Sequence, residues 1–171
     1  LHPMPDSQWT GEPMTAQDPQ FLDPRDLAAF ILEVSRRAIV GGDYAAFQAR
    51  LALPHAAGSL AGHTVIRTDE AVRRVFDGIQ AHMRATNATD LHRSVMNASF
   101  DGPERVFVAH QSSWVVAGRH LTDPYSCRFL ALCEDGIWKI KSGTYSTPSP
   151  LLQKAFAAGH AIERTADRAQ D

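Results

Sequence analysis

Residues 91–117, LHRSVMNASFDGPERVFVAHQSSWVVA, decide the fold of this chain. Before this stretch, apolar residues recur every three or four positions, whereas within it they alternate with polar ones. Alternation with a period of two is typical of β-strands, and Asp101-Gly102-Pro103 divides the stretch at a turn. We therefore expect two antiparallel strands, over residues 91–100 and 105–117.

Two further strands are expected after this pair. Residues 125–133 and 137–145 are rich in apolar and aromatic side chains, and Glu134-Asp135-Gly136 separates them. An Asp-Gly pair between two such runs is a strong hairpin signal. A bend over residues 120–124 connects them to the preceding pair. Four successive strands joined by short turns form an antiparallel meander.

Three helices are expected before the meander. Asp23-Pro24 opens the first, a periodic apolar stripe follows, and Gly41-Gly42 ends it. Asp43 is the expected N-cap of a second helix, which we predict to continue to Pro54. A short strand within residues 58–67 precedes a third helix, capped by Thr68. Helices segregated from strands predict an α+β fold, with the three N-terminal helices packed on one face of a strongly curved, mainly antiparallel sheet.

This order of elements contains two local signatures, TDEAVRRVFDGI at residues 68–79 and DGIWKI at residues 135–140. Together they resemble the nuclear-transport-factor-2-like superfamily, which includes SnoaL-like polyketide cyclases, ketosteroid isomerases and scytalone dehydratase. The resemblance covers about residues 21–147. It implies a cone in which the helices close the bent sheet around an internal pocket, and whose outer sheet face makes a dimer. Neither signature is a catalytic motif, so both indicate a fold rather than an activity.

Length and charge limit the organisation and the partners. The 171 residues correspond to about one domain, with an irregular arm over 1–20, the cone over 21–147 and a C-terminal extension over 148–171. A formal net charge of −2 provides no positive field for nucleic acid. The longest apolar run, over 27–32, is far shorter than the about 20 residues of a membrane span, and the first residues lack the features of a signal peptide. We expect no nucleic-acid or membrane partner and a cytoplasmic location.

Motifs for metal, cofactor or nucleophilic chemistry are absent from the sequence, which has no GxSxG, P-loop, GxGxxG or HExxH. No cysteine or carboxylate cluster completes a zinc site around His55 and His63. Cys127 and Cys133 fall in one expected strand, roughly 20 Å apart, which is too far for a disulfide. We therefore predict no metal and no cofactor.

Polar residues on the expected strands are the remaining candidates for a site. His110 is a candidate general base, because a neutral imidazole titrates close to working pH. Tyr125, and also Tyr145, are candidate donors to a developing oxyanion. Each has a structural alternative, since His110 can lie on a dimer or solvent face and a strand-end tyrosine often packs with its hydroxyl in water.

Five further residues are candidate ligand-binding residues: Trp114, Arg128, Arg93, Trp138 and Ser142. Arg128 lies in an otherwise apolar strand, where a guanidinium requires a carboxylate from either a substrate or the protein. Arg93 alternates with His92, so one of the two faces inward.

The last expected strand and the tryptophans supply the other candidates. Trp138 and Ser142 alternate with Lys139 and Lys141, and because the lysines are expected to face water, Trp138 and Ser142 are expected to face inward. Trp114 and Trp138 are either ligand-stacking platforms or parts of the core.

Three functions remain open. The favoured one is a noncatalytic homodimer that binds a small apolar or aromatic ligand, because the inward aspartate that related cyclases and isomerases use is missing from residues 91–100, 105–117 and 125–133. The second is a small isomerase, cyclase or dehydratase for an aromatic or polyketide-like substrate, in which His110 moves a proton and Tyr125 or Arg128 stabilises negative charge. The third is a structural β-type subunit of a ring-hydroxylating dioxygenase, since the small subunits of those enzymes share the cone.

Overall fold

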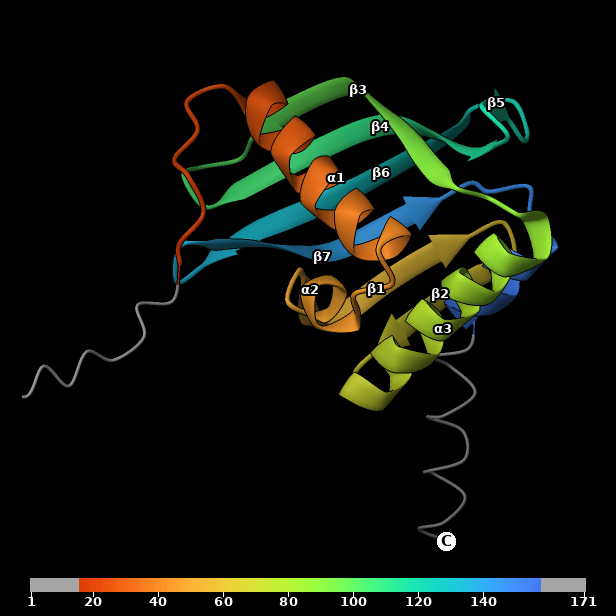
Figure 1. Cartoon of the computed structure of the whole chain (residues 1–171). Coiled ribbons are helices and arrows are strands. Elements are labelled where there is room, and N and C mark those ends of the chain that lie inside the picture. Colours follow the sequence, from red (N-terminus) through yellow and green to blue (C-terminus); the bar gives the residue numbers. More distant parts are fainter. Residues whose placement is uncertain (1–15, 158–171) are drawn as a thin grey trace, which may run out of the picture.

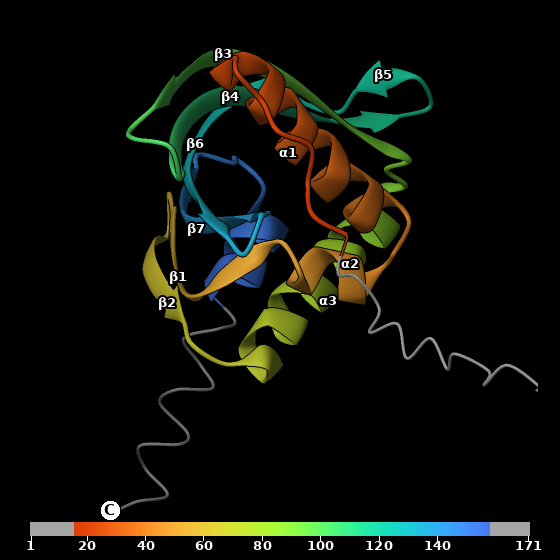
Figure 2. The same cartoon turned by 90° about the vertical axis from the view of Figure 1, so that its left-hand side faces the viewer.

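The computed structural model describes residues 16–157 (Figure 1). Helices cover one face of a seven-stranded sheet, and the sheet curls around them (Figure 2). The elements are, in chain order, α1 (Pro24–Val40), α2 (Tyr44–Gln48), β1 (Leu51–Ser59), β2 (Gly62–Ile66), α3 (Asp69–Thr86), β3 (Asp90–Phe100), β4 (Arg105–Val116), β5 (Arg119–His120), β6 (Tyr125–Glu134) and β7 (Ile137–Tyr145). The predicted α+β class is confirmed.

The strand order across the sheet is β2-β1-β7-β6-β4-β3, and the short β5 pairs with β4. The expected meander is therefore confirmed as β3-β4-β6-β7, with every neighbouring pair antiparallel. The β1–β2 pair is antiparallel as well, whereas β1 lies parallel to β7. This parallel contact places the N-terminal hairpin beside the last strand.

The second helix is shorter than predicted. It ends at Gln48, and the chain then enters β1 rather than remaining helical as far as Pro54. A strand forms here because pairing with β2 on one side and β7 on the other satisfies the hydrogen bonds of its backbone N–H and C=O groups. Proline has no N–H to donate, and Pro54 lies where the β1–β7 register shifts, between Leu51 and Ala56.

The two long helices begin at the capping residues that their sequences predict. The Asp23 side chain accepts a hydrogen bond from the Arg25 N–H at the start of α1, at 2.7 Å. At the start of α3, the Thr68 hydroxyl accepts one from the Ala71 N–H, at 3.2 Å. Asn87 ends α3 with a left-handed backbone, which asparagine tolerates better than most residues.

Two groups of buried side chains form the core. The apolar stripe of α1, including Leu27 and Ile31, packs on the helix-facing side of β4, β6 and β7. The stripe of α3 packs with residues such as Leu91 and with the helical segment over 150–157, which contributes Leu152 and Ala155. The chain beyond residue 147 is thus partly built into the domain.

Most of the expected N-terminal arm, residues 1–15, lies outside the described residues, as do residues 158–171 of the expected C-terminal extension. The described end of the arm is held by Asp18, which forms a two-pronged ion pair with Arg50 at 2.6 and 2.9 Å. Asp18 also accepts the Trp138 N–H at 2.8 Å, and its own N–H donates to the Gly136 carbonyl at 2.9 Å. These contacts fasten the arm to the β6–β7 hairpin.

Candidate functional site

The alternation of β4 shows which face of the sheet lies under the helices. Val106, Val108, His110, Ser112 and Trp114 share one face and are all buried. On the other face, Ser113 is buried, but Ala109 and Gln111 are half-buried and Phe107 is 44% exposed. His110 therefore lies inside the cone.

Polar side chains meet in two cross-strand rows on this inner face. Arg93 of β3 is paired with Ser112 of β4, which is paired with Tyr125 of β6. One step along, His110 of β4 is paired with Cys127 of β6, which is paired with Tyr145 of β7. Cross-strand partners point to the same side of a sheet, so the register alone brings these six together. We call them the interior polar cluster.

Hydrogen bonds connect three members of this cluster. The Ser112 hydroxyl and the His110 Nδ1 atom are 3.2 Å apart, and the Cys127 thiol donates to the Ser112 oxygen at 3.7 Å. The edge of the His110 ring meets the Phe129 ring, with 5.7 Å between centroids. Cys127 is a free thiol, as is Cys133, which confirms the prediction that the two do not pair.

Burial keeps the titratable members of the cluster neutral. Loss of solvent, helped by the nearby charge of Arg93, lowers the pKa of His110 to about 3. Burial raises the pKa of Tyr125 to about 12 and raises the pKa values of Tyr145 and Cys127 above their ordinary range. The imidazole, both phenols and the thiol are therefore uncharged near neutral pH.

Arg93 is the charged member of the cluster. Burial lowers its pKa, but a guanidinium begins so high that it remains protonated. Its Nη1 atom donates to the Ser35 hydroxyl of α1 at 2.6 Å, and its Nε atom is buried without a hydrogen-bond partner. Among residues 16–157, no carboxylate forms an ion pair with it. The cone thus holds a cation that the described protein groups do not neutralise.

Both candidate tryptophans lie on the inner face, but outside this cluster. Trp138 is buried against α1 as part of the core, so its side chain is packed among apolar groups. Trp114 is buried with its ring 5.0 Å from that of His82 in α3.

The expectation that Ser142 faces inward is wrong. The β6–β7 register shifts, so that Leu130 is paired with Ser142 while Ala131 is paired with Ile140. The extra residue, Lys141, is a β-bulge that turns Ser142 to the face without helices. A strict period of two cannot anticipate this reversal.

Arg128 also lies on the helix-free face, where it is exposed. It directly follows Cys127 of the interior polar cluster, but its side chain points to the opposite side of β6. Together with Ser142 it lines an open groove of about 520 Å³. Side chains such as Phe107, Leu130 and Val65 make most of this groove apolar. The candidates thus divide between two faces of one sheet.

The sequence pattern does not single out Ser112 or Cys127 as site residues, and it does not distinguish Arg93 from His92. The missing signal is the strand register, because the β3–β4 pairing itself shifts between Val95 and Asn97. The sequence pattern also does not indicate the role of Gly143. Any side chain at this position would collide with the Tyr145 phenol that lies over it, so the glycine makes room for that member of the interior polar cluster.

The part of the chain that the structure describes contains no group of three or more metal-ligating side chains. None of its helices is long and apolar enough to cross a membrane.

No family model and no curated protein matches this chain. Solved structures do match it. An NTF2-like protein of unknown function from Shewanella oneidensis is 14% identical, with a TM-score of 0.55, over 73% of this chain and 100% of that one. A domain of unknown function with a cystatin-like fold from Nostoc punctiforme is 13% identical, with a TM-score of 0.56, over 89% and 100%.

An NTF2-like protein of unknown function in nutrient uptake from Rhodospirillum rubrum is 20% identical, with a TM-score of 0.53, over 71% of this chain and 98% of that one. At these identities the likeness concerns the fold. This chain has the nuclear-transport-factor-2-like cone fold that its sequence predicts.

Proposed function

We propose that this protein binds a small molecule inside its cone, at the interior polar cluster, and that it does so as a noncatalytic homodimer. The observation that carries the proposal is Arg93, a charged side chain with a buried donor that no described protein group accepts. An unpartnered buried donor is costly, so it signals a missing acceptor. The neutral phenols and the Ser112 hydroxyl around it provide further hydrogen bonds for such a ligand.

Proton transfer is poorly supported by the same cluster. A general base works best when its pKa lies near the operating pH. The His110 pKa of about 3 makes the imidazole too weak a base, and the Tyr125 pKa of about 12 keeps its phenol protonated. No carboxylate among residues 90–145 lies in the cluster to replace them.

The second candidate function is a small isomerase, cyclase or dehydratase. One observation favours it, namely the hydrogen-bonded chain from His110 through Ser112 to the Cys127 thiol. If bound substrate supplied a negative charge near His110, the imidazole would become a stronger base. A His110→Asn variant separates the two functions, because it should retain ligand binding in both but abolish turnover only in an enzyme.

The first experiment is native mass spectrometry of the purified protein, followed by denaturation and identification of any released small molecule. A released ligand whose binding weakens when Tyr125 or Ser112 is substituted supports the proposal. A ligand-free protein that also binds nothing from a small-molecule library overturns it. A mass that corresponds to a complex with a larger iron-containing chain would instead favour the dioxygenase-subunit alternative.

The homodimer is proposed to form through the helix-free face of the sheet. The support is the composition of this face. A solvated sheet face normally carries polar side chains, whereas this one exposes Phe107, with the half-buried Leu130 also lining the groove. Light scattering after size exclusion should give twice the chain mass, and Phe107→Glu should give the single mass. Leu22→Glu is the matched control, since Leu22 is 99% exposed and lies outside the groove. A wild-type monomer would refute the interface.

A further inference from the structure

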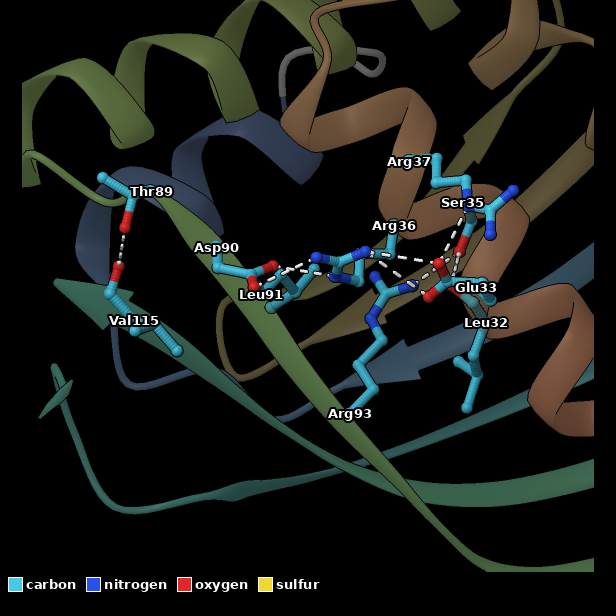
Figure 3. Close-up of polar contacts among 10 residues, drawn as sticks. All are labelled: Leu32, Glu33, Ser35, Arg36, Arg37, Thr89, Asp90, Leu91, Arg93 and Val115. Atoms are coloured by element: carbon cyan, nitrogen blue, oxygen red, sulfur yellow. Dashed lines mark hydrogen bonds and ion pairs between the residues drawn. The ribbon is translucent and has the colours of Figure 1, made fainter. Parts of the chain in front are cut away.

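A crevice between α1 and β3 leads to the Arg93 side chain. It has a volume of about 190 Å³, the room of about six water molecules. Its lining combines apolar surface with charge, from Ala29, Leu32, Glu33, Arg36, Arg93 and Val95. Figure 3 shows Arg93 reaching from β3 toward Ser35 and Glu33 of α1. Arg93 is therefore common to this crevice and to the interior polar cluster.

The charged neighbours of the crevice are already committed to one another. Arg36 binds Asp90 through two hydrogen bonds, at 2.8 and 3.0 Å, and also contacts Glu33 at 3.3 Å. Arg37 binds the same Glu33 carboxylate at 2.8 Å. The carboxylates of Glu33 and Asp90 thus form ion pairs with Arg36 and Arg37, and neither carboxylate forms an ion pair with Arg93 (Figure 3). The uncompensated positive charge therefore belongs to Arg93.

The free donors of Arg93 have the geometry for a carboxylate. Its Nη1 atom is held by Ser35, which fixes the plane of the guanidinium. Nε and Nη2 form the remaining side of the planar group, and Nε is buried without a partner. Two parallel N–H donors on one side of a guanidinium match the two oxygens of a carboxylate.

We propose that this crevice binds a small monocarboxylic acid, whose carboxylate occupies the Nε/Nη2 side of Arg93 and whose short apolar body lies against Leu32 and Val95. This inference rests on the proposed function and specifies the chemical class of its ligand. The volume selects a small acid rather than a long-chain lipid. Glu33 lines the same crevice, but its charge is compensated by Arg36 and Arg37, so it does not repel the ligand strongly.

The test is a calorimetric titration of the full chain with benzoate and with benzamide, its uncharged analogue. Benzoate should bind and benzamide should bind at least about 10-fold more weakly, because the charge-assisted pair is lost. Arg93→Met should weaken benzoate binding by about 10- to 100-fold, and Arg93→Lys should recover part of the loss. Arg119→Met is the matched control, because Arg119 is an exposed arginine of β5 that lines neither the crevice nor the groove, and it should leave benzoate binding unchanged.

Failure of the inference is distinguishable from failure of the proposed function. Absence of benzoate binding, equal affinity for benzamide, or benzoate binding that is unaffected by Arg93→Met each overturns the carboxylate site. If the native protein then still releases an uncharged molecule whose binding depends on Tyr125 or Ser112, the proposed function stands without the carboxylate site. Urea unfolding of the Arg93→Met variant verifies that it folds, which is expected because the substitution removes a half-buried cation that forms no ion pair with the described carboxylates.

Discussion

Acidification should unfold this protein partly through His110. The imidazole is 3% exposed, and its pKa falls from an ordinary 6.5 to about 3 in the folded chain. The unfolded chain therefore binds a proton in the interval between these values, whereas the folded chain does not. Stability is fully present above about pH 6.5 and is lost as the pH falls toward the folded pKa.

The expected loss follows from the two pKa values. A pH of about 5 lies some 1.5 units below the pKa of the imidazole in the unfolded chain. At about 1.4 kcal/mol per unit, protonation of the unfolded chain lowers the free energy of unfolding by about 2 kcal/mol. Any folded pKa below about 4 gives the same figure at that pH. Below about pH 3 the full difference, about 5 kcal/mol, is reached.

Urea unfolding at about pH 8 and about pH 5 measures the effect, with His110→Asn as the comparison. Other groups titrate in this range, including His55 and His82, whose pKa values burial also lowers. The unfolding free energy is therefore measured at both pH values for each protein. We expect it to fall by about 2 kcal/mol more in the wild type than in the variant between about pH 8 and about pH 5. Identical pH dependence in the two proteins would refute the neutral, buried imidazole and would restore His110 as a candidate base.

Three further predictions concern the framework of the cone, each measured by urea unfolding. Asp18→Asn should lower the free energy of unfolding by about 3 kcal/mol, because it leaves the largely buried Arg50 without its ion-pair partner. Arg36→Met should lower the free energy of unfolding by only about 1 kcal/mol. The Arg36–Asp90 pair has a similar two-pronged geometry, but both of its members are partly exposed. Equal losses in the two variants would contradict the role of burial. Gly78→Ala should cost about 1–3 kcal/mol, because the new methyl would lie 2.6 Å from the Ala155 methyl, and Ala155→Gly should restore much of the loss. Failure of that rescue would show that the segment over 150–157 does not pack on α3 in solution.

Much of the cone is encoded locally. The stripes of α1 and α3, their caps at Asp23 and Thr68, and the Asp-Gly hairpin between β6 and β7 all lie within short segments. Each such signal depends on near neighbours in the chain, so the elements and their α+β arrangement follow from the sequence. The β1 segment is the exception, because its partners in β2 and β7 stabilise a strand where local preference continued a helix.

The site required the tertiary structure, because side-chain direction in a sheet reverses with every one-residue shift of register. Residue types alone identified His110, Tyr125 and Arg93 as polar groups in strands, but could not show that the three share one face. Ser142 shows the reverse case, since the bulge at Lys141 turned it to the opposite face. Likewise, Arg93 has no carboxylate partner because Arg36 of α1 binds Asp90 of β3, 54 residues further along the chain, while Arg36 and Arg37 both bind Glu33 within α1. The sequence by itself determined a cone and the polar residues of its strands, and only long-range pairing decided which of them face one another and which charge remains unpaired.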